Sequence, residues 1–124
     1  GMGVTHKFVS GSERRVIKKE TAQEITRMLT IDTDTALFGG SLKMEHYSIA
    51  VKTGTAQIVE NGKYSDKDFL HTFVGYFPSY DPKFVMFLSV KDPQGAQYGS
   101  QTLSLPFMQI AKFLLNYYEV PPDR

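Results

Sequence analysis

The sequence predicts an α+β domain in which an antiparallel sheet of at least three strands packs against an N-terminal and a C-terminal helix. Two segments near the ends of the chain repeat apolar residues every three to four positions, which is the spacing of an amphipathic helix. Between them lie three segments that are rich in β-branched and aromatic residues and are separated by turns. A length of 124 residues fits one domain with a core of its own.

The first helix is expected from Lys18 to about Thr30. Its apolar stripe consists of Ala22, Ile25, Met28 and Leu29. Glu20 lies near the start, where a carboxylate interacts favourably with the helix dipole. Residues 31–44 lose this period and contain two adjacent glycines, so we expect a loop there.

The three strands are expected at residues 46–57, 69–77 and 84–90. We expect a turn over residues 60–68, because the pair Asn61-Gly62 tolerates the positive φ angles that close a hairpin. A second turn covers residues 78–83. The last strand, FVMFLSV, is almost unbroken in its apolar character, which is typical of a strand covered on both faces.

A polar loop over residues 91–102 is expected before the second helix. The apolar residues of this helix recur at helical spacing, as Leu105, Met108, Ala111 and Leu115. Ser104 can cap the first turn, and Pro106 is compatible with a helix only if it lies in that turn. The sequence Pro-Pro-Asp at 121–123 ends the helix.

Residues 1–13 are expected to stand apart from the domain, which spans 14–124. Gly1 before Met2 has the pattern of a residue left when an expression tag is cleaved. The segments KFV (7–9) and RRVI (14–17) can pair as a short hairpin around Ser-Gly-Ser. Ser-Gly-Ser is also the kind of linker used to join two pieces of a longer chain, so both interpretations stay open.

Composition excludes several classes of function. The chain has 14 basic and 13 acidic residues, and this near-neutral balance argues against a nucleic-acid partner. It has no cysteine, which excludes disulfides and thiolate metal sites. No apolar run is long enough to span a membrane and no export signal is visible, so we expect this chain to be soluble.

Histidines and glycine-rich stretches give no sign of a metal or cofactor. His6, His46 and His71 lie far apart without ligand spacing, so we expect no metal site and interpret them as surface or strand-end residues. The stretches FGGS and PQGAQYGS lack the Gly-Lys-Ser/Thr ending of a phosphate-binding loop. We therefore expect no cofactor.

The stretch VKTGT places Lys52, Thr53, Gly54 and Thr55 inside an expected strand. At a sheet edge, the lysine can supply positive charge, the threonines can donate hydrogen bonds, and the glycine lets a ligand backbone approach. Such an edge suits a peptide that ends in a carboxylate. The alternative is a surface lysine followed by two strand threonines and a bulge at Gly54.

The order of the motifs resembles the C-terminal part of the transpeptidase domain of class B high-molecular-weight penicillin-binding proteins. The resemblance rests on AVKTGTAQ (50–57), on HTFVGYFPSYDPKFVMFLSVKDP (71–93), and on LPFMQIAKFLL (105–115) followed by Pro-Pro-Asp. RRVIKKETAQEITRML (14–29) is similar to the helix that precedes the Lys-Thr-Gly strand in that family.

This resemblance implies a five-stranded antiparallel sheet with helices on both faces, and a role for each residue of the motif. Lys52 would add positive charge to a catalytic network, and Thr53 and Thr55 would bind the carboxylate of a stem peptide or a β-lactam. The backbone N–H of Thr55 would supply half of an oxyanion hole. Gly54 would keep the strand edge open.

The family's nucleophile, in a Ser-x-x-Lys motif, and its Ser-x-Asn motif have no counterpart in this sequence. None of the nine serines has a lysine three positions on or an asparagine two positions on. The serines are Ser10, Ser12, Ser41, Ser48, Ser65, Ser79, Ser89, Ser100 and Ser104. We therefore expect a fragment of a peptidoglycan D,D-transpeptidase that is not catalytic alone.

Two other functions remain open, a non-catalytic peptide-binding or scaffold module and part of a β-lactamase or β-lactam sensor. The resemblance implies a parent protein that is attached to the bacterial cytoplasmic membrane and acts outside the cytoplasm. A sheet edge left exposed would favour a homodimer or a domain swap.

Overall fold

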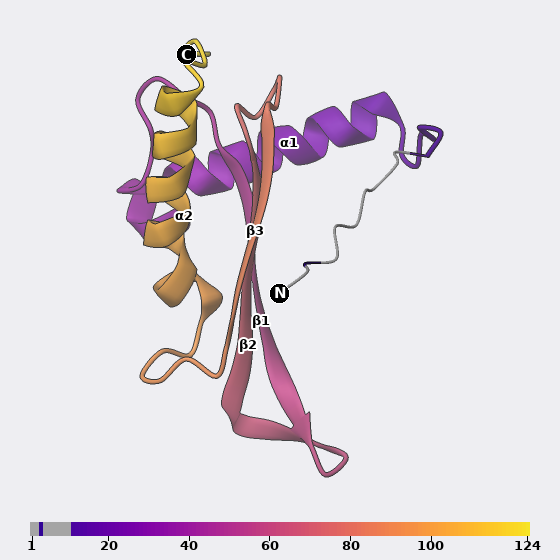
Figure 1. Ribbon diagram of the computed structural model, residues 1–124, viewed down its shortest axis with the longest axis vertical. Coiled ribbons are helices and arrows are strands. Elements are labelled where there is room, and N and C mark those ends of the chain that lie inside the picture. Colours follow the sequence, from indigo (N-terminus) through magenta and orange to yellow (C-terminus); the bar gives the residue numbers. More distant parts are fainter. Residues whose placement is uncertain (1–2, 4–10) are drawn as a thin grey trace.

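Helix, strands and helix follow one another in the order that the sequence predicts. The structure is a computed structural model, which describes residue 3 and residues 11–124. The elements are α1 (Lys19–Thr35), the 3₁₀ helix η1 (Leu37–Gly40), β1 (Ala50–Glu60), β2 (Lys63–Phe77), β3 (Phe84–Lys91) and α2 (Gly99–Tyr117). Figure 1 shows the long strands side by side, with α2 along one side of the sheet and α1 crossing it.

The three strands form one antiparallel sheet in the order β1-β2-β3. Asn61 and Gly62, with φ angles of 50° and 76°, form the whole turn between β1 and β2. The expected turn over 60–68 was therefore too long, because cross-strand pairing continues as far as Glu60 and Lys63. Both strands of the hairpin extend further than the apolar pattern indicated.

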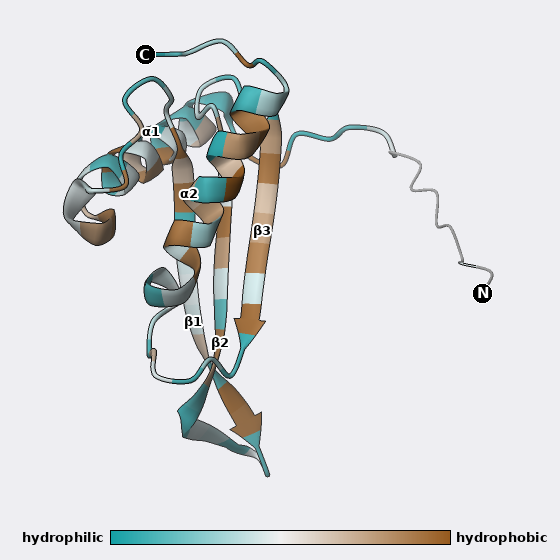
Figure 2. Cartoon of the chain, turned by 60° about the vertical axis from the view of Figure 1, so that its left-hand side comes forward, coloured by the Kyte–Doolittle hydropathy of each residue, from teal (hydrophilic) through white to brown (hydrophobic). Residues whose placement is uncertain are grey.

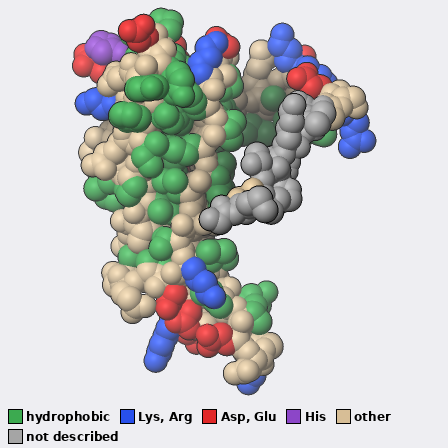
Figure 3. All heavy atoms as spheres, viewed as in Figure 1, with side chains coloured by type: hydrophobic (Ala, Val, Ile, Leu, Met, Phe, Trp, Pro, Cys, Tyr) green, Lys and Arg blue, Asp and Glu red, His purple; other side chains and the backbone are tan. Residues whose placement is uncertain are grey.

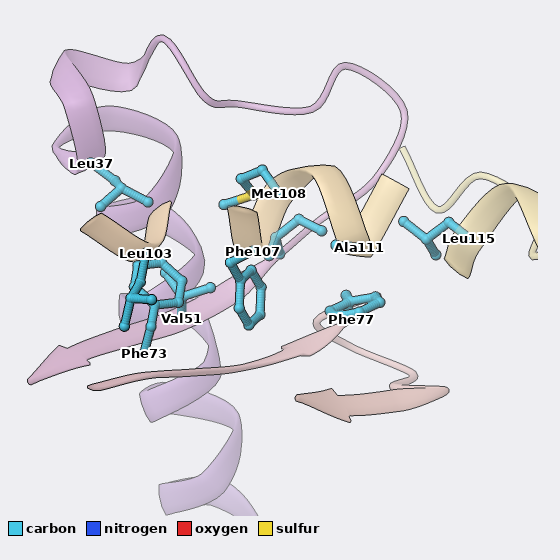
Figure 4. Packing of buried hydrophobic residues seen from close by; sticks show 10 residues of the cluster. Leu37, Val51, Phe73, Phe77, Leu103, Phe107, Met108, Ala111 and Leu115 are labelled. Atoms are coloured by element: carbon cyan, nitrogen blue, oxygen red, sulfur yellow. The ribbon is translucent and has the colours of Figure 1, made fainter. Parts of the chain in front are cut away.

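The core lies between the sheet and α2. Alternate residues of β2, including Phe73 and Phe77, point toward the helix, as the two-residue period of a strand requires. Phe107 of α2 packs between them, with ring centroids 4.7 Å from Phe73 and 5.9 Å from Phe77. Figure 4 shows these rings together with Val51 and the apolar side chains of α2.

The opposite face of the sheet is covered only in part. Thr26 of α1 shares a hydrogen bond of 2.7 Å with the hydroxyl of Tyr76, so α1 covers this end of β2. Along β3 the burial alternates, and Val85 and Phe87 are 77% and 61% exposed. The expectation that β3 is covered on both faces is wrong for this structure, although Figure 2 shows how apolar the strand is along its length.

Both helices are longer than expected. α1 continues to Thr35, and in this last part the hydroxyls of Thr30, Thr33 and Thr35 bond to carbonyls one turn back. α2 begins at Gly99, so Ser104 is not its cap. Ser104 is buried inside the helix, and Pro106 lies well beyond the first turn.

Residues 11–18 contain no strand, so the described half of the expected N-terminal hairpin is absent. The segment KFV (7–9), its other half, lies outside the described residues. Within the part of the chain that the structure describes, neither helix is long and apolar enough to cross a membrane.

The C-terminal tail folds back onto the start of the sheet. The carboxylate of Asp123 accepts hydrogen bonds from the backbone N–H, at 2.7 Å, and from the hydroxyl of Ser48. Ser48 in turn accepts the N–H of Ser79 at 2.9 Å, and the hydroxyls of Ser79 and Thr30 share a hydrogen bond of 2.8 Å. This polar chain joins the tail, the sheet and α1.

Candidate functional site

The four residues Lys52, Thr53, Gly54 and Thr55 lie in the middle of β1, which is an edge strand of the sheet. They pair without interruption with residues 71–74 of β2. The pairing becomes irregular only between Gln57 and Val59, so the alternative of a bulge at Gly54 is wrong. The motif therefore stands on a regular strand, with one backbone edge unpaired in the described part of the chain.

Lys52 and Thr53 border a hollow of about 330 Å³ beside β1. The end of α1 with η1 forms the opposite wall, and Ser100 of α2 closes one side. The Lys52 ammonium is exposed and donates a 2.7 Å hydrogen bond to the carbonyl of Thr53. Since an ammonium has three donors, two remain for a ligand at the same edge.

Thr55 contacts the beginning of α2. Its Oγ1 accepts a hydrogen bond of 3.0 Å from the backbone N–H of Gly99, the first residue of that helix. This N–H is one of the donors that a helix leaves without an internal partner. The hydroxyl hydrogen of Thr55 has no acceptor among the described residues, and the side chain is exposed. The hydroxyl is therefore fixed through its oxygen and remains available as a donor.

Glycines allow the strand and the helix to meet this closely. A Cβ on Gly99 would lie 2.6 Å from the carbonyl oxygen of Gly54, and 3.1 Å from that of Thr72. A Cβ on Gly54 would lie 2.2 Å from Oγ1 of Thr72. The side chain of Thr72, across the ladder, thus leaves room only for glycine at position 54. The residue pattern of the strand did not indicate this reason.

His71 lies behind the motif and contacts residues near the start of α2, and its expected position was wrong. It is 0% exposed, and its ring lies 2.9 Å from both Thr102 Oγ1 and the carbonyl of Gln97. The expectation of a surface or strand-end histidine is wrong for this residue, because α2 covers this position of β2. His46 is exposed, as expected, and His6 lies outside the described residues.

Charged pairs outside the motif explain the shifted pKa values. On α1, a hydrogen bond from Arg27 lowers the pKa of Glu24. The hydrogen bond with Asp34 raises the pKa of Arg124.

A second hollow, of about 510 Å³, lies between residues 66–69 and 92–97. The described residues contain no cluster of acidic or histidine side chains suited to a metal ion.

Comparisons of the chain with family models and with known proteins point to the same family. A family model described as penicillin binding protein transpeptidase domain matches residues 6–112. The chain is 26% identical, over 94% of its length, to the probable peptidoglycan D,D-transpeptidase PenA of Neisseria meningitidis serogroup A. It covers 20% of that protein, so it spans about a fifth of the length of this curated relative.

Solved structures agree with this result. The TP domain of Burkholderia pseudomallei penicillin-binding protein 3, in its apo form, superposes with a TM-score of 0.74 at 30% identity. That match covers 90% of this chain and 34% of the solved one. Penicillin-binding protein 3 of Mycobacterium tuberculosis, complexed with ampicillin, gives a TM-score of 0.72 at 27% identity, over 87% of this chain and 26% of the other.

Proposed function

The chain belongs to the transpeptidase domain family of class B penicillin-binding proteins, and on this premise we propose that β1 binds the carboxylate of a stem peptide or a β-lactam. We further propose that residues 14–124 form the C-terminal subdomain of such a domain. The observation that carries the proposal is the hydroxyl of Thr55, whose oxygen accepts the Gly99 N–H while its hydrogen has no acceptor in the described residues.

A carboxylate beside β1 would meet three kinds of donor. The ammonium of Lys52 supplies charge, and the hydroxyls of Thr53 and Thr55 supply hydrogen bonds, which are strengthened when the acceptor is ionised. The first turn of α2 adds the positive end of its dipole behind Thr55. The backbone N–H of Thr55 is our candidate for one half of an oxyanion hole.

In the longer parent protein, a serine hydroxyl would attack the carbonyl between the last two residues of the stem peptide. An ester would form and the terminal D-alanine would leave. An acceptor amine would then attack the ester, forming the cross-link and releasing the serine. We place this parent outside the cytoplasm, attached to the bacterial cytoplasmic membrane.

The chain by itself is proposed to bind without reacting. None of its nine serines stands in the Ser-x-x-Lys context of the family's nucleophile, and half an oxyanion hole does not replace that serine. Incubation with a fluorescent penicillin, followed by denaturing electrophoresis, should show no labelled chain. A stable covalent adduct would contradict this part of the proposal.

Reversible binding is tested with a pentapeptide that ends in D-alanyl-D-alanine. In ¹⁵N-labelled protein, the amide signals of residues 52–55 should shift saturably on titration. Lys52→Ala should remove this response, whereas Lys63→Ala, an equal loss of charge at an exposed position of β2, should leave it unchanged. The same peptide amidated at its C-terminus should bind far more weakly. If no saturable shift occurs, β1 is not a carboxylate site.

We also propose that the exposed edge and outer face of β3 pair with a second copy of the chain. Val85 and Phe87 present apolar surface beside a strand that has no partner on its outer edge in the described residues. Light scattering at increasing concentration should then report a dimer, and a strictly monomeric mass would contradict the proposal.

A further inference from the structure

His71 lies directly across the β1-β2 ladder from Thr55. Residues opposite each other in such a ladder point to the same face of the sheet, and here that face carries the first turn of α2. Thr55 receives the N–H of Gly99 at 3.0 Å. His71 binds on both sides of this amide, at the carbonyl of Gln97 and at the hydroxyl of Thr102.

The partners of His71 fix which ring nitrogen carries the hydrogen. A backbone carbonyl can only accept, so Nε2–H must donate to Gln97 across 2.9 Å. In the neutral ring Nδ1 then accepts from the hydroxyl of Thr102, also at 2.9 Å. The other acceptor of that hydroxyl, the carbonyl of Gly99, is farther away at 3.3 Å. The neutral Nε2–H tautomer therefore satisfies the ring and ties it to the helix start.

His71 can hold the start of α2 because no side chain separates Gly99 from the backbone of β1 and β2. Gly99 packs on the backbone of Gly54 and Thr72 with no room for a side chain. Its amide must therefore follow any movement of the segment between Gln97 and Thr102. A movement of that amide changes the direction in which the hydroxyl of Thr55 is held.

We propose that His71 is a positioning residue for Thr55. By binding Gln97 and Thr102, it keeps the Gly99 amide on Thr55 Oγ1, so that the hydroxyl hydrogen of Thr55 points away from α2 toward a carboxylate ligand. His71 does not touch the ligand itself. This inference rests on the proposed carboxylate site, and its experiment separates the two.

The experiment compares His71→Phe, His71→Gln and Thr102→Val with the unmodified chain. Amide hydrogen exchange of Gly99 is measured relative to that of Phe107 in the core, which corrects for changes in global stability. Loss of the anchoring bonds should speed exchange at Gly99 by about fivefold to tenfold, the effect of losing one or two buried hydrogen bonds. The dissociation constant of the D-alanyl-D-alanine pentapeptide should rise by a similar factor.

Glutamine provides the conservative control. Its side-chain amide can still donate to the carbonyl of Gln97, so His71→Gln should recover part of the Gly99 protection that His71→Phe loses. Thr102→Val keeps the histidine and removes its Nδ1 partner, together with the longer bond from that hydroxyl to the Gly99 carbonyl. It decides the question if His71→Phe does not fold. The ring ¹⁵N shifts of the unmodified chain should report the Nε2–H tautomer.

If His71 only stabilised the fold as a whole, its variants would not change the exchange of Gly99 relative to that of Phe107. Ser79→Ala removes the buried hydrogen bond between the hydroxyls of Ser79 and Thr30, just beyond the far end of β2, and lowers stability, but it should not change the relative exchange of Gly99. If His71→Phe and Thr102→Val behave like Ser79→Ala, the His71 proposal is wrong. If Gly99 responds as expected but the unmodified chain binds no peptide, the proposed function fails and the anchoring of Gly99 by His71 still holds.

Discussion

Gly54 lies opposite Thr72, and the hydroxyl of Thr72 fills the space that a side chain at position 54 would need. The distance from the missing Cβ to Thr72 Oγ1 would be 2.2 Å. The obstacle is the end of one side chain rather than backbone, so a shorter residue at position 72 removes it. The need for glycine in this motif therefore has a structural component inside the sheet, separate from any ligand.

The two positions should show strong coupling when both are substituted. We expect Gly54→Ala to lower the free energy of unfolding by about 1–3 kcal/mol, the usual cost of overpacking. In a Thr72→Ala background, the same change should be neutral or slightly stabilising, because alanine is favoured over glycine in a strand. Urea denaturation of the four proteins measures the coupling.

Gly11→Ala serves as the control for glycine replacement, since its Cβ would meet nothing within 4 Å. It should change stability very little. If Gly54→Ala were equally costly with and without the Thr72 side chain, the obstacle would have to be the backbone, and Thr72 would not be the reason for the glycine.

At the scale of an element, α2 carries a proline well inside the helix. Pro106 has no N–H, so the carbonyl four residues earlier, that of Thr102, lacks its usual helical donor. Pro106 is exposed on the outer side of the helix, away from the core that Phe107 and Ala111 form with the sheet. The helix survives because packing against the sheet compensates for the local defect.

Pro106→Ala should therefore raise the stability of the chain. Restoring the hydrogen bond and relieving the ring clash should raise the free energy of unfolding by about 1–3 kcal/mol, which thermal denaturation measures as a higher Tm. Leu105→Ala, at the exposed neighbouring position, should leave Tm nearly unchanged. A lower Tm for Pro106→Ala would mean that the proline bends α2 into a shape that the core requires.

At the scale of the whole molecule, the C-terminal residue closes the structure around the start of β1. Arg124 donates hydrogen bonds to the carboxylate of Asp34 at the end of α1 and, at 3.2 Å, to the carbonyl of Met44. The Arg124–Asp34 pair is partly exposed, with side-chain exposures of 25% and 14%. It joins residues that are 90 positions apart in the sequence.

A double-mutant cycle with Asp34→Asn and Arg124→Met tests this closure. We expect a coupling energy of about 0.5–1 kcal/mol, the upper range for partly exposed pairs. The more exposed pair Glu24–Arg27, with side-chain exposures of 55% and 53%, is the matched control and should couple less. Equal coupling for both pairs would show that the tail adds nothing beyond an ordinary surface ion pair.

The surface of the whole molecule is unevenly apolar. Figure 3 shows hydrophobic side chains gathered over the middle of one face, with charged side chains toward its ends. On the outer side of the sheet, Val85 and Phe87 of β3 are also exposed. Exposed apolar surface next to a strand edge that has no partner in the described residues favours association between chains.

Val85→Lys with Phe87→Lys should therefore prevent self-association. Both side chains are exposed, so the double variant should keep the fold and the stability of the monomer. Sedimentation at several concentrations should show a monomer where the unmodified chain forms dimers. Phe113→Lys with Tyr117→Lys, exposed on α2, is the control that should leave the dimer intact. Dimers that persist in the β3 variant would place the interface elsewhere.

The sequence by itself determined the order of helix, strands and helix, the Asn61-Gly62 turn and the place of Lys52 to Thr55 in a strand. These features depend on residues within a few positions of one another, so periodicity and turn chemistry reveal them. The motif order also led to the transpeptidase family, which the comparisons confirm.

Only the tertiary structure decided where α2 begins and what holds Thr55. At this start, Thr55, 44 residues earlier, accepts the N–H of Gly99, and His71 bonds to Gln97 and Thr102 on either side of it, beside the local contact of Gln101 with the Tyr98 N–H. The buried state of His71 and the exposed outer face of β3 likewise depend on which element covers which strand. Contacts between distant segments leave no local pattern, so the sequence pattern could place the motif but could not show its support.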